Sequence, residues 1–347
     1  KFKGVITEPD IRRAIILIRS EGDDGLNYGM GHIYRSIAIC KAFEKTHKIF
    51  FITSSKLNIV RFIKKNLKCT VIRLKKEKFE KIKKIFNKSN ILINDTFGKM
   101  QKINRYAELH NMKIVSFDDL NPSFKKGIII NAISHYRKKI KNFKMIKYYG
   151  GFKYLILRDI FNKDYHTKRK KGFYFVSSGG SDSKNYLNKI TNLLIKLNPK
   201  KIFCLVGIAV KKNNPIFNLS RRNKKVRLLT NISNPIPYLK KSEFSIVSGG
   251  TIAFESVLLN CKTITVQSHH HQIFASKYLN RKKLIIDLGK LEDISFKKIS
   301  KTLLEINKKK IFFNNPNKII DNLGKKRVVK ILNNYINEKR NSNNSSS

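Results

Sequence analysis

The sequence has few cysteines and no pattern that would use them. Its four cysteines, Cys40, Cys69, Cys204 and Cys261, lie in apolar stretches, and no two of them form a Cys-x-x-Cys pair. This arrangement argues against a disulfide framework and offers no metal or redox motif. We therefore expect free, buried thiols in a reducing compartment, and we expect neither a metal nor another cofactor.

Long apolar runs are also missing. No run of about 18 apolar residues exists, and the longest ones, such as residues 127–133, have the length of a strand. No signal peptide is recognisable. These absences argue against a membrane-spanning protein and predict a soluble, cytoplasmic one.

Acidic residues are scarce compared with basic ones. The 347 residues include 23 Asp and Glu against 74 Lys and Arg, a formal net charge of +51. Such a charge favours nucleic acid, an anionic membrane or a phosphorylated substrate as a partner. The lysines are spread along the whole chain, so compositional drift and selection for an anionic partner both stay open. No nucleic-acid recognition motif is present, which argues against a specific nucleic-acid partner. Peripheral contact with an anionic membrane stays open.

The remaining sequence alternates between strand-like and helix-like segments. An apolar content of 41% suits folded domains, and the length suits two of them. Continuous apolar runs predict buried strands, and segments with helical spacing of apolar residues follow most of them. This rhythm predicts an α/β protein with two doubly wound, parallel sheets. The expected strands are 14–18, 49–53, 69–74, 91–94, 113–117 and 128–131, then 173–177, 202–206, 226–229, 244–247 and 263–266.

A polar, basic segment at residues 162–171 separates the two halves and is interpreted as a linker. We expect one Rossmann-like domain at residues 15–161 and a second at residues 172–335. Two such domains joined by one linker predict a ligand cleft between them. The Asn- and Ser-containing tail, residues 341–347, is expected to be disordered.

The first residues of the chain show a separate similarity. The run from Gly4 to Ala14 is similar to the closing strand and helix start of a CBS module. Residues 1–14 are therefore expected to be a remnant of an upstream CBS-like module. An ordinary leader peptide is the alternative.

A glycine-containing loop follows the first strand and precedes a helix. It reads Gly29-Met30-Gly31-His32-Ile33-Tyr34-Arg35. Glycine lets the backbone approach a ligand, and the N–H groups at a helix start face an anion. His32 would lie in the first turn of the helix and point into the cleft as a base. Spacing alone leaves a ligand loop and a plain turn open.

Two glycine pairs occupy the same kind of position in the second half. Gly179-Gly180-Ser181-Asp182 could hold phosphates, or form a tight turn with a serine or aspartate as helix cap. Gly249-Gly250-Thr251 opens a helix that suits a diphosphate. Glu255, one turn further on, could accept both ribose hydroxyls or pair with the helix dipole.

Acidic residues follow two strands of the first half. Asp95 follows the strand 91–94, and Asp118-Asp119 follow the strand 113–117, which is the ligand side of such sheets. Helix capping is the alternative for each. The tract His269-His270-His271 looks metal-binding, but adjacent histidines do not converge well on one ion and no Cys or acid flanks them. We expect no metal there and regard Gln272 as the residue of interest.

In this order the motifs resemble those of the UDP-2,4-diacetamido-2,4,6-trideoxy-β-L-altropyranose hydrolases of pseudaminic acid biosynthesis and their relatives in spore-coat polysaccharide synthesis. The resemblance runs from about Ile16 to Leu288. The motifs that carry it are Arg19-Ser20-Glu21, Gly29 to Arg35, Phe117-Asp118-Asp119, Asn131, Gly151 to Phe161, Gly179 to Asp182, Gly249 to Glu255 and His271-Gln272. The hydrolases usually have Asp-x-Tyr where this sequence has Asn94-Asp95-Thr96-Phe97. That departure favours the spore-coat branch and leaves the sugar open.

The resemblance implies a GT-B architecture in which the second domain holds UDP and the first carries the chemistry. It implies His32, Asp119 and Asp95 as catalytic residues, with His32 activating a water that attacks the anomeric carbon. The residues expected to bind the UDP-sugar are Gly29, Gly31, Arg35, Arg19, Asn131, Tyr154, Arg158, Gly179, Gly180, Ser181, Asp182, Gly249, Gly250, Thr251, Glu255 and Gln272.

The implied function is a UDP-sugar hydrolase. It would release UDP from a UDP-diacetamido-trideoxyhexose in the biosynthesis of a nonulosonate, pseudaminate-like sugar. A GT-B glycosyltransferase that uses a UDP-sugar donor in surface polysaccharide synthesis is the alternative.

Overall fold

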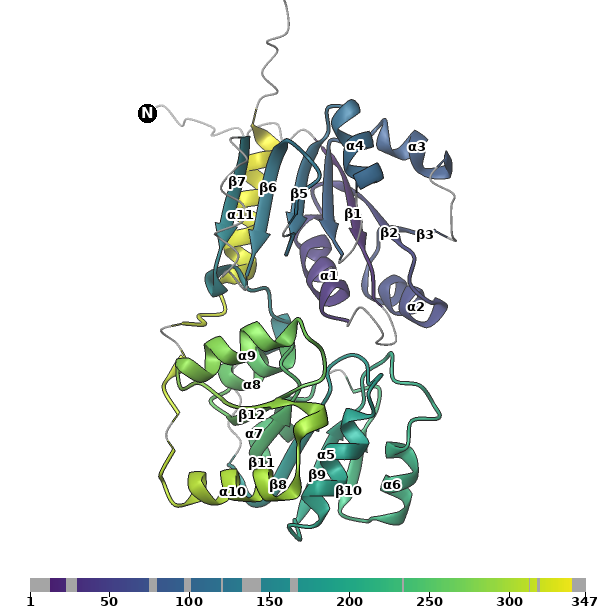
Figure 1. The fold of residues 1–347 in the computed structure, drawn as a ribbon. Helices are drawn as coiled ribbons and strands as arrows, with labels where there is room; N and C mark the ends of the chain where they lie inside the picture. The colour runs from purple at the N-terminus through teal and green to yellow at the C-terminus, as the bar shows by residue number, and fades with distance from the viewer. Residues whose placement is uncertain are drawn as a thin grey trace, which may run out of the picture.

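Two parallel β-sheets, each covered by helices, form the two halves of the molecule, which lie one above the other in Figure 1. The computed structural model describes residues 13–22, 30–74, 80–96, 101–119, 121–132, 145–162, 168–232, 234–311, 313–316 and 319–338. The predicted α/β class is confirmed. The expected CBS-like remnant, apart from its last two residues, and the expected tail lie outside the described residues.

The first sheet has the strand order β3-β2-β1-β4-β5-β6-β7, and all its neighbours are parallel. In β1, Ile16 and Ile18 pack into one core cluster and Leu17 into another, so both faces of the sheet are buried. The order reverses between β1 and β4, which is where such sheets bind ligands. The strands are β1 (Ile15–Ser20), β2 (Lys48–Thr53), β3 (Thr70–Arg73), β4 (Ile91–Asp95), β5 (Lys113–Phe117), β6 (Lys126–Asn131) and β7 (Met145–Gly150).

The second sheet has the order β10-β9-β8-β11-β12-β13 and reverses between β8 and β11. Its strands are β8 (Lys170–Ser177), β9 (Lys201–Leu205), β10 (Val226–Leu229), β11 (Ser242–Val247), β12 (Lys262–Gln267) and β13 (Ile286–Lys290). Each predicted strand overlaps an observed one. The edge strands β7 and β13 were not predicted, because polar residues or glycine interrupt both segments and neither is a continuous apolar run.

Helices cover both faces of each sheet. The described α-helices are α1 (Gly31–Phe43), α2 (Leu57–Asn66), α3 (Glu80–Phe86), α4 (Gln101–Leu109), α5 (Tyr186–Ile195), α6 (Ile216–Arg222), α7 (Ile236–Lys241), α8 (Thr251–Leu258), α9 (Gln272–Arg281), α10 (Phe296–Asn307) and α11 (Gly324–Asn337). Short 3-10 helices lie at η1 (Phe152–Tyr154), η2 (Asp159–Asn162) and η3 (Leu291–Asp293). Among the described helices, none is both long and apolar enough to span a membrane.

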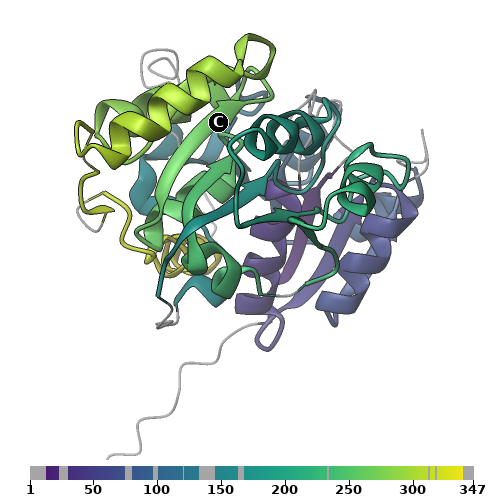
Figure 2. The same ribbon diagram turned by 90° about the horizontal axis from the view of Figure 1, so that it is seen from below.

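The helix α11 belongs to the first half in space, although it comes last in sequence. Val328 and Leu332 are fully buried in the same core cluster as α1 and β6. Figure 1 shows α11, in yellow, beside β6 and β7, and Figure 2 shows the molecule from below, with the second half in front of the first. The last helix of the predicted second domain, residues 172–335, therefore packs on the first sheet. Apolar spacing predicts such a helix but does not say which sheet it covers.

Candidate active site

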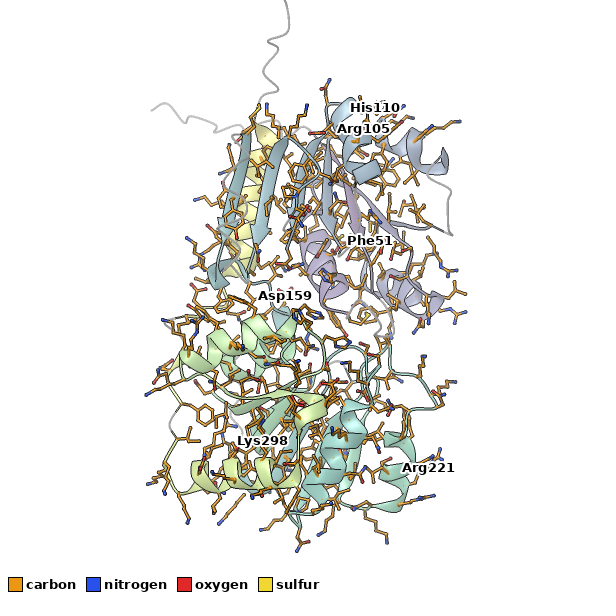
Figure 3. The ribbon with its side chains drawn as sticks, in the orientation of Figure 1. Phe51, Arg105, His110, Asp159, Arg221 and Lys298 are labelled. Carbon is orange, nitrogen blue, oxygen red and sulfur yellow. The ribbon has the colours of Figure 1, made fainter. Side chains whose placement is uncertain are left out.

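A cavity of about 630 Å³ lies between the two halves. Its walls come from the segments that follow each strand from β5 to β12, together with residues of α1 and α2. The carboxyl ends of both sheets therefore face one space, as the sequence predicted. Figure 3 shows Asp159 at the boundary between the halves, and His110 and Arg105 at the far end of the first half.

His32 lies in the first turn of α1 and lines this cavity. Its Nδ1 atom is 2.6 Å from Oδ1 of Asp95, the last residue of β4. Asp95 is completely buried and also accepts a hydrogen bond from the Ser36 hydroxyl, 3.1 Å from Oδ2. The switch point between β1 and β4 thus brings together the histidine and one of the predicted carboxylates.

Arg35, one turn after His32, joins two carboxylates. It donates from Nε to Oδ2 of Asp95 at 2.8 Å and from Nη1 to Oδ2 of Asp118 at 2.7 Å. Burial alone would lower the pKa of Arg35, but Asp118 and Asp95 outweigh it and raise that pKa. Burial alone would raise the pKa of Asp95, but Arg35 and then His32 hold it well below its usual range. Asp95 is therefore a carboxylate at every pH of interest.

An ionised Asp95 determines which proton His32 carries. A carboxylate can only accept, so the Nδ1 atom of His32 donates to it, which leaves Nε2 as the nitrogen that can take a further proton. A guanidinium nitrogen of Arg35 lies 3.2 Å from the same Nδ1, which is the longer of the two contacts. The contact with Asp95 fixes the orientation of the His32 ring, and a ring held in one orientation with its Nδ1 atom occupied suits a general base that acts through Nε2.

The second carboxylate of this network is Asp118 and not Asp119. Asp118 has a left-handed backbone conformation, φ 51°, and lines the cavity. Asp119 instead accepts hydrogen bonds from the Ser116 hydroxyl at 3.0 Å and from the Asn121 N–H at 3.1 Å. Burial raises the pKa of Asp119, although those two hydrogen bonds oppose it. The structure therefore does not bring the predicted catalytic Asp119 to His32.

The glycine pair after β8 faces the first half of the molecule. A Cβ atom on Gly180 would lie 2.3 Å from the Cβ atom of Met30, so only glycine lets the two loops meet. Gly179, Gly180 and Ser181 line the cavity. Asp182 instead accepts from the N–H of Leu187, near the start of α5, and from the Asn214 amide at 2.9 Å. Burial raises the pKa of Asp182, and the structure supports the capping alternative for it.

The loop after β11 presents the start of α8 to the cavity. Gly249, Gly250 and Thr251 line it, and no side chain caps this helix start. A Cβ atom on Gly249 would lie 2.3 Å from the Ser276 hydroxyl, so α9 packs directly on the loop. Gly31 faces the same helix start, since its Cβ would lie 3.3 Å from the Thr251 hydroxyl. Backbone N–H groups at such a start suit an anion.

Glu255 and Arg158 both line the cavity and form an ion pair. Both carboxylate oxygens of Glu255 accept from Arg158, at 2.7 and 2.6 Å, and only 2% of Glu255 is exposed. Burial would lower the pKa of Arg158, but Glu255 outweighs it and raises that pKa, so Arg158 is charged. The guanidinium of Arg158 also lies 5.5 Å from the ring centre of Tyr34 on α1. This pair thus connects α8 of the second half to α1 of the first.

Of the remaining predicted residues, one lines the cavity and three others do not. Gln272 lines the cavity, and its Oε1 accepts from the Ser268 N–H at 2.9 Å. Arg19, which donates to Glu21 at 2.9 Å, and the buried Asn131 do not line it. Tyr154 packs edge-to-face against Tyr149, also away from the cavity. Gly29 lies outside the described residues.

Several cavity residues were not predicted. Among them are Asn58, Arg61 and Lys65 on α2, and His269 and His271 after β12. The histidines follow the carboxyl end of a strand, which was the signal available for them. The side chains on α2 gave no signal, because exposed basic residues occur throughout this chain.

Several known proteins resemble this chain in sequence or in fold. No protein-family model matches the chain. The uncharacterized protein MJ1062 of Methanocaldococcus jannaschii is 27% identical over 279 residues, which cover 72% of this chain and 55% of that protein. The chain thus spans about half the length of this archaeal protein.

Two further relatives have named roles. The spore coat polysaccharide biosynthesis protein SpsG of Bacillus subtilis is 20% identical over 279 residues, 77% of this chain and 82% of that protein. The UDP-2,4-diacetamido-2,4,6-trideoxy-β-L-altropyranose hydrolase of Campylobacter jejuni is 25% identical over 262 residues, 70% of this chain and 88% of that protein.

Solved structures match over nearly the whole chain. MurG of Acinetobacter baumannii superposes with a TM-score of 0.61 at 10% identity, covering 93% of this chain and 99% of that one. MnaA of S. aureus, solved with UDP, gives a TM-score of 0.61 at 12% identity, covering 93% and 97%. At such identities the likeness shows the fold alone. The chain therefore has the GT-B fold and, as its ordered motifs predicted, is a homologue of the spore-coat polysaccharide protein and the altropyranose hydrolase.

Proposed function

We propose that this chain is an enzyme that acts on a UDP-sugar and hydrolyses it. The observation that carries the proposal is the hydrogen bond between His32 and Asp95, in a cavity whose opposite wall has an uncapped helix start. The first feature suits a general base and the second suits a diphosphate. The altropyranose hydrolase and the UDP complex of the MnaA structure support a UDP-sugar as the substrate class. A UDP-diacetamido-trideoxyhexose is the specific substrate we propose.

In the proposed reaction, His32 takes a proton from a water molecule through Nε2. The water oxygen bonds to the anomeric carbon, and the bond from that carbon to the phosphoryl oxygen breaks with its electron pair on UDP. Asp95 stabilises the imidazolium that forms, because its negative charge lies 2.6 Å from Nδ1. Backbone N–H groups at Gly250 and Thr251 stabilise the charge on the departing diphosphate. No step in this scheme needs a metal.

The test is the release of UDP from a UDP-diacetamido-trideoxyhexose with water as the acceptor, measured by chromatography. We expect His32→Ala to slow release by about 10²- to 10⁴-fold. The exposed His110, at the far end of the first half, provides a matched control, and His110→Ala should retain the full rate. A wild-type chain that releases no UDP, or a His32→Ala variant as fast as the wild type, would contradict the hydrolase.

A glycosyltransferase on the same scaffold is the second candidate. The observation that favours it is the wall formed by α2, where the polar side chains of Asn58, Arg61 and Lys65 line the cavity. That space could hold a sugar or lipid acceptor in place of water. Turnover that starts only when an acceptor is added would identify this reaction. Release of UDP with water alone would show that no other acceptor is needed.

A further inference from the structure

Two histidines line the cavity from the second half of the molecule, and the proposed role of His32 does not use them. His269 and His271 lie in the loop between β12 and α9 and line the cavity, whereas the exposed His270 between them does not. The two rings stack with centres 5.6 Å apart and an angle of 27° between planes. The side chains of the three histidines therefore alternate along the loop, and the imidazoles of His269 and His271 face the cavity.

Hydrogen bonds fix the loop that presents these rings. The Ser268 hydroxyl lies 2.9 Å from Nδ1 of His269, and the Ser183 hydroxyl lies 3.3 Å from Nε2 of the same ring. The amide oxygen of Gln272 accepts from the Ser268 N–H at 2.9 Å. Because both nitrogens of His269 have serine neighbours, this ring is held in place and supports the stacked ring of His271.

His271 stands beside the helix start that suits a diphosphate. β11 and β12 are neighbouring parallel strands, so the loops that follow them lie side by side. A Cβ atom on Gly249 would lie 3.0 Å from the Cβ atom of Gln272, the residue after His271. From the other half, His32 and Asp118 are close enough to interact electrostatically with His271. His271 therefore lies near both the phosphate side and the reacting side of the cavity.

The imidazole of His271 is neutral at pH 7. The ring lines the cavity, and burial among protein atoms, followed by the proximity of His269 and His32, lowers its pKa to about 4. Asp118 would raise this pKa, but its effect is smaller than that of burial. A neutral imidazole has one N–H donor, which can bond to a phosphoryl oxygen without a change of charge. Within the part of the chain that the structure describes, no group of three or more His, Cys, Asp or Glu side chains is arranged to hold a metal ion.

We propose that His271 donates its N–H to a phosphoryl oxygen of the bound nucleotide diphosphate, namely the oxygen whose bond to the sugar breaks. In this arrangement His269 holds His271 in position by stacking. This inference rests on the proposed function. When the bond between the anomeric carbon and the phosphoryl oxygen breaks, its electron pair stays on that oxygen, and the N–H of His271 stabilises the charge without giving up its proton. The proton from water goes to His32 in the same step.

Isothermal titration calorimetry with UDP and with uridine tests this contact, because uridine lacks the phosphoryl oxygens. We expect His271→Ala to weaken UDP binding by about tenfold or more and to leave uridine binding unchanged. His271→Asn, whose amide can still donate, should recover part of the UDP affinity. His270→Ala changes the neighbouring, outward-facing imidazole and should bind UDP as the wild type does.

The outcomes separate this inference from the proposed function. Equal UDP affinity in the wild type and His271→Ala would overturn the inference alone. An equal loss of UDP and uridine affinity in His271→Ala would also overturn it, since the change would then act on the shape of the pocket. A wild-type chain that binds uridine but shows no gain in affinity for UDP would overturn the proposed function as well.

Discussion

At the scale of single residues, Asp95 accepts hydrogen bonds from His32, Arg35 and Ser36. We expect Asp95→Asn to reduce the rate of UDP release by about 10²- to 10⁴-fold, because an amide neither fixes the Nδ1 proton of His32 nor stabilises the imidazolium. UDP affinity should change little, since Asp95 does not line the cavity. Steady-state kinetics and calorimetry measure the two effects separately. Asp119→Asn is the matched control and should keep most of the rate; a larger loss in Asp119→Asn than in Asp95→Asn would show that the structure selects the wrong carboxylate.

The depressed pKa of Asp95 also predicts how stability depends on pH. Because its folded pKa is below the unfolded value of about 3.9, the contribution of Asp95 to stability is complete above that value and is lost as the pH falls below it. Urea unfolding of the wild type and of Asp95→Asn between about pH 3 and pH 7 measures this contribution as a difference. We expect that difference to be constant above about pH 5 and to shrink towards acid. A difference that stays constant down to pH 3 would mean that Asp95 is not the titrating group.

At the scale of elements, α11 is the last helix of the chain and is buried against the first sheet. Leu332 is fully buried there, whereas Leu304 on α10 is 53% exposed. We expect Leu332→Ala to lower the free energy of unfolding by about 2–5 kcal/mol and Leu304→Ala to change it by less than about 0.5 kcal/mol. The chain has no tryptophan, so far-UV circular dichroism in denaturant is the suitable measurement. Equal effects of the two substitutions would contradict the packing of α11 on the first half.

The same elements show how far the sequence leads. Apolar runs predicted the buried strands well, because a strand covered on both faces has to be continuously apolar. They could not assign α11 to a sheet, since the apolar stripe of a helix is the same whichever sheet it covers. The choice between Asp118 and Asp119 depended on one left-handed residue, Asp118, that no local pattern reveals. The partner of Glu255 is Arg158, 97 residues away in sequence, so a motif that contains only Glu255 could not predict their ion pair.

At the scale of the whole molecule, the net charge of +51 surrounds a cavity that is proposed to bind a dianionic diphosphate. Long-range attraction of this kind is screened, because the Debye length falls from about 10 Å at 0.1 M salt to about 3 Å at 1 M. We therefore expect UDP affinity to fall as sodium chloride rises, while uridine affinity stays nearly constant. Calorimetric titrations of both ligands over that range of salt measure the effect. If both ligands respond equally, the charge does not act on the nucleotide.

Charge-neutralising variants at two distances then separate selection from drift. Arg61 and Lys65 line the cavity, whereas Arg221 on α6 and Lys298 on α10 lie away from the boundary between the halves, as Figure 3 shows for the latter two. The double change of Arg61 and Lys65 to Gln should flatten the salt dependence of UDP binding, because these groups line the cavity that is proposed to bind UDP. The same change of Arg221 and Lys298 should leave it as in the wild type. If both double variants weaken the salt dependence of UDP binding equally, the attraction depends on the total charge and not on its position, which is what compositional drift predicts. A fall confined to the cavity pair would mean that a few basic side chains serve the anionic substrate while the others accumulated without such a role.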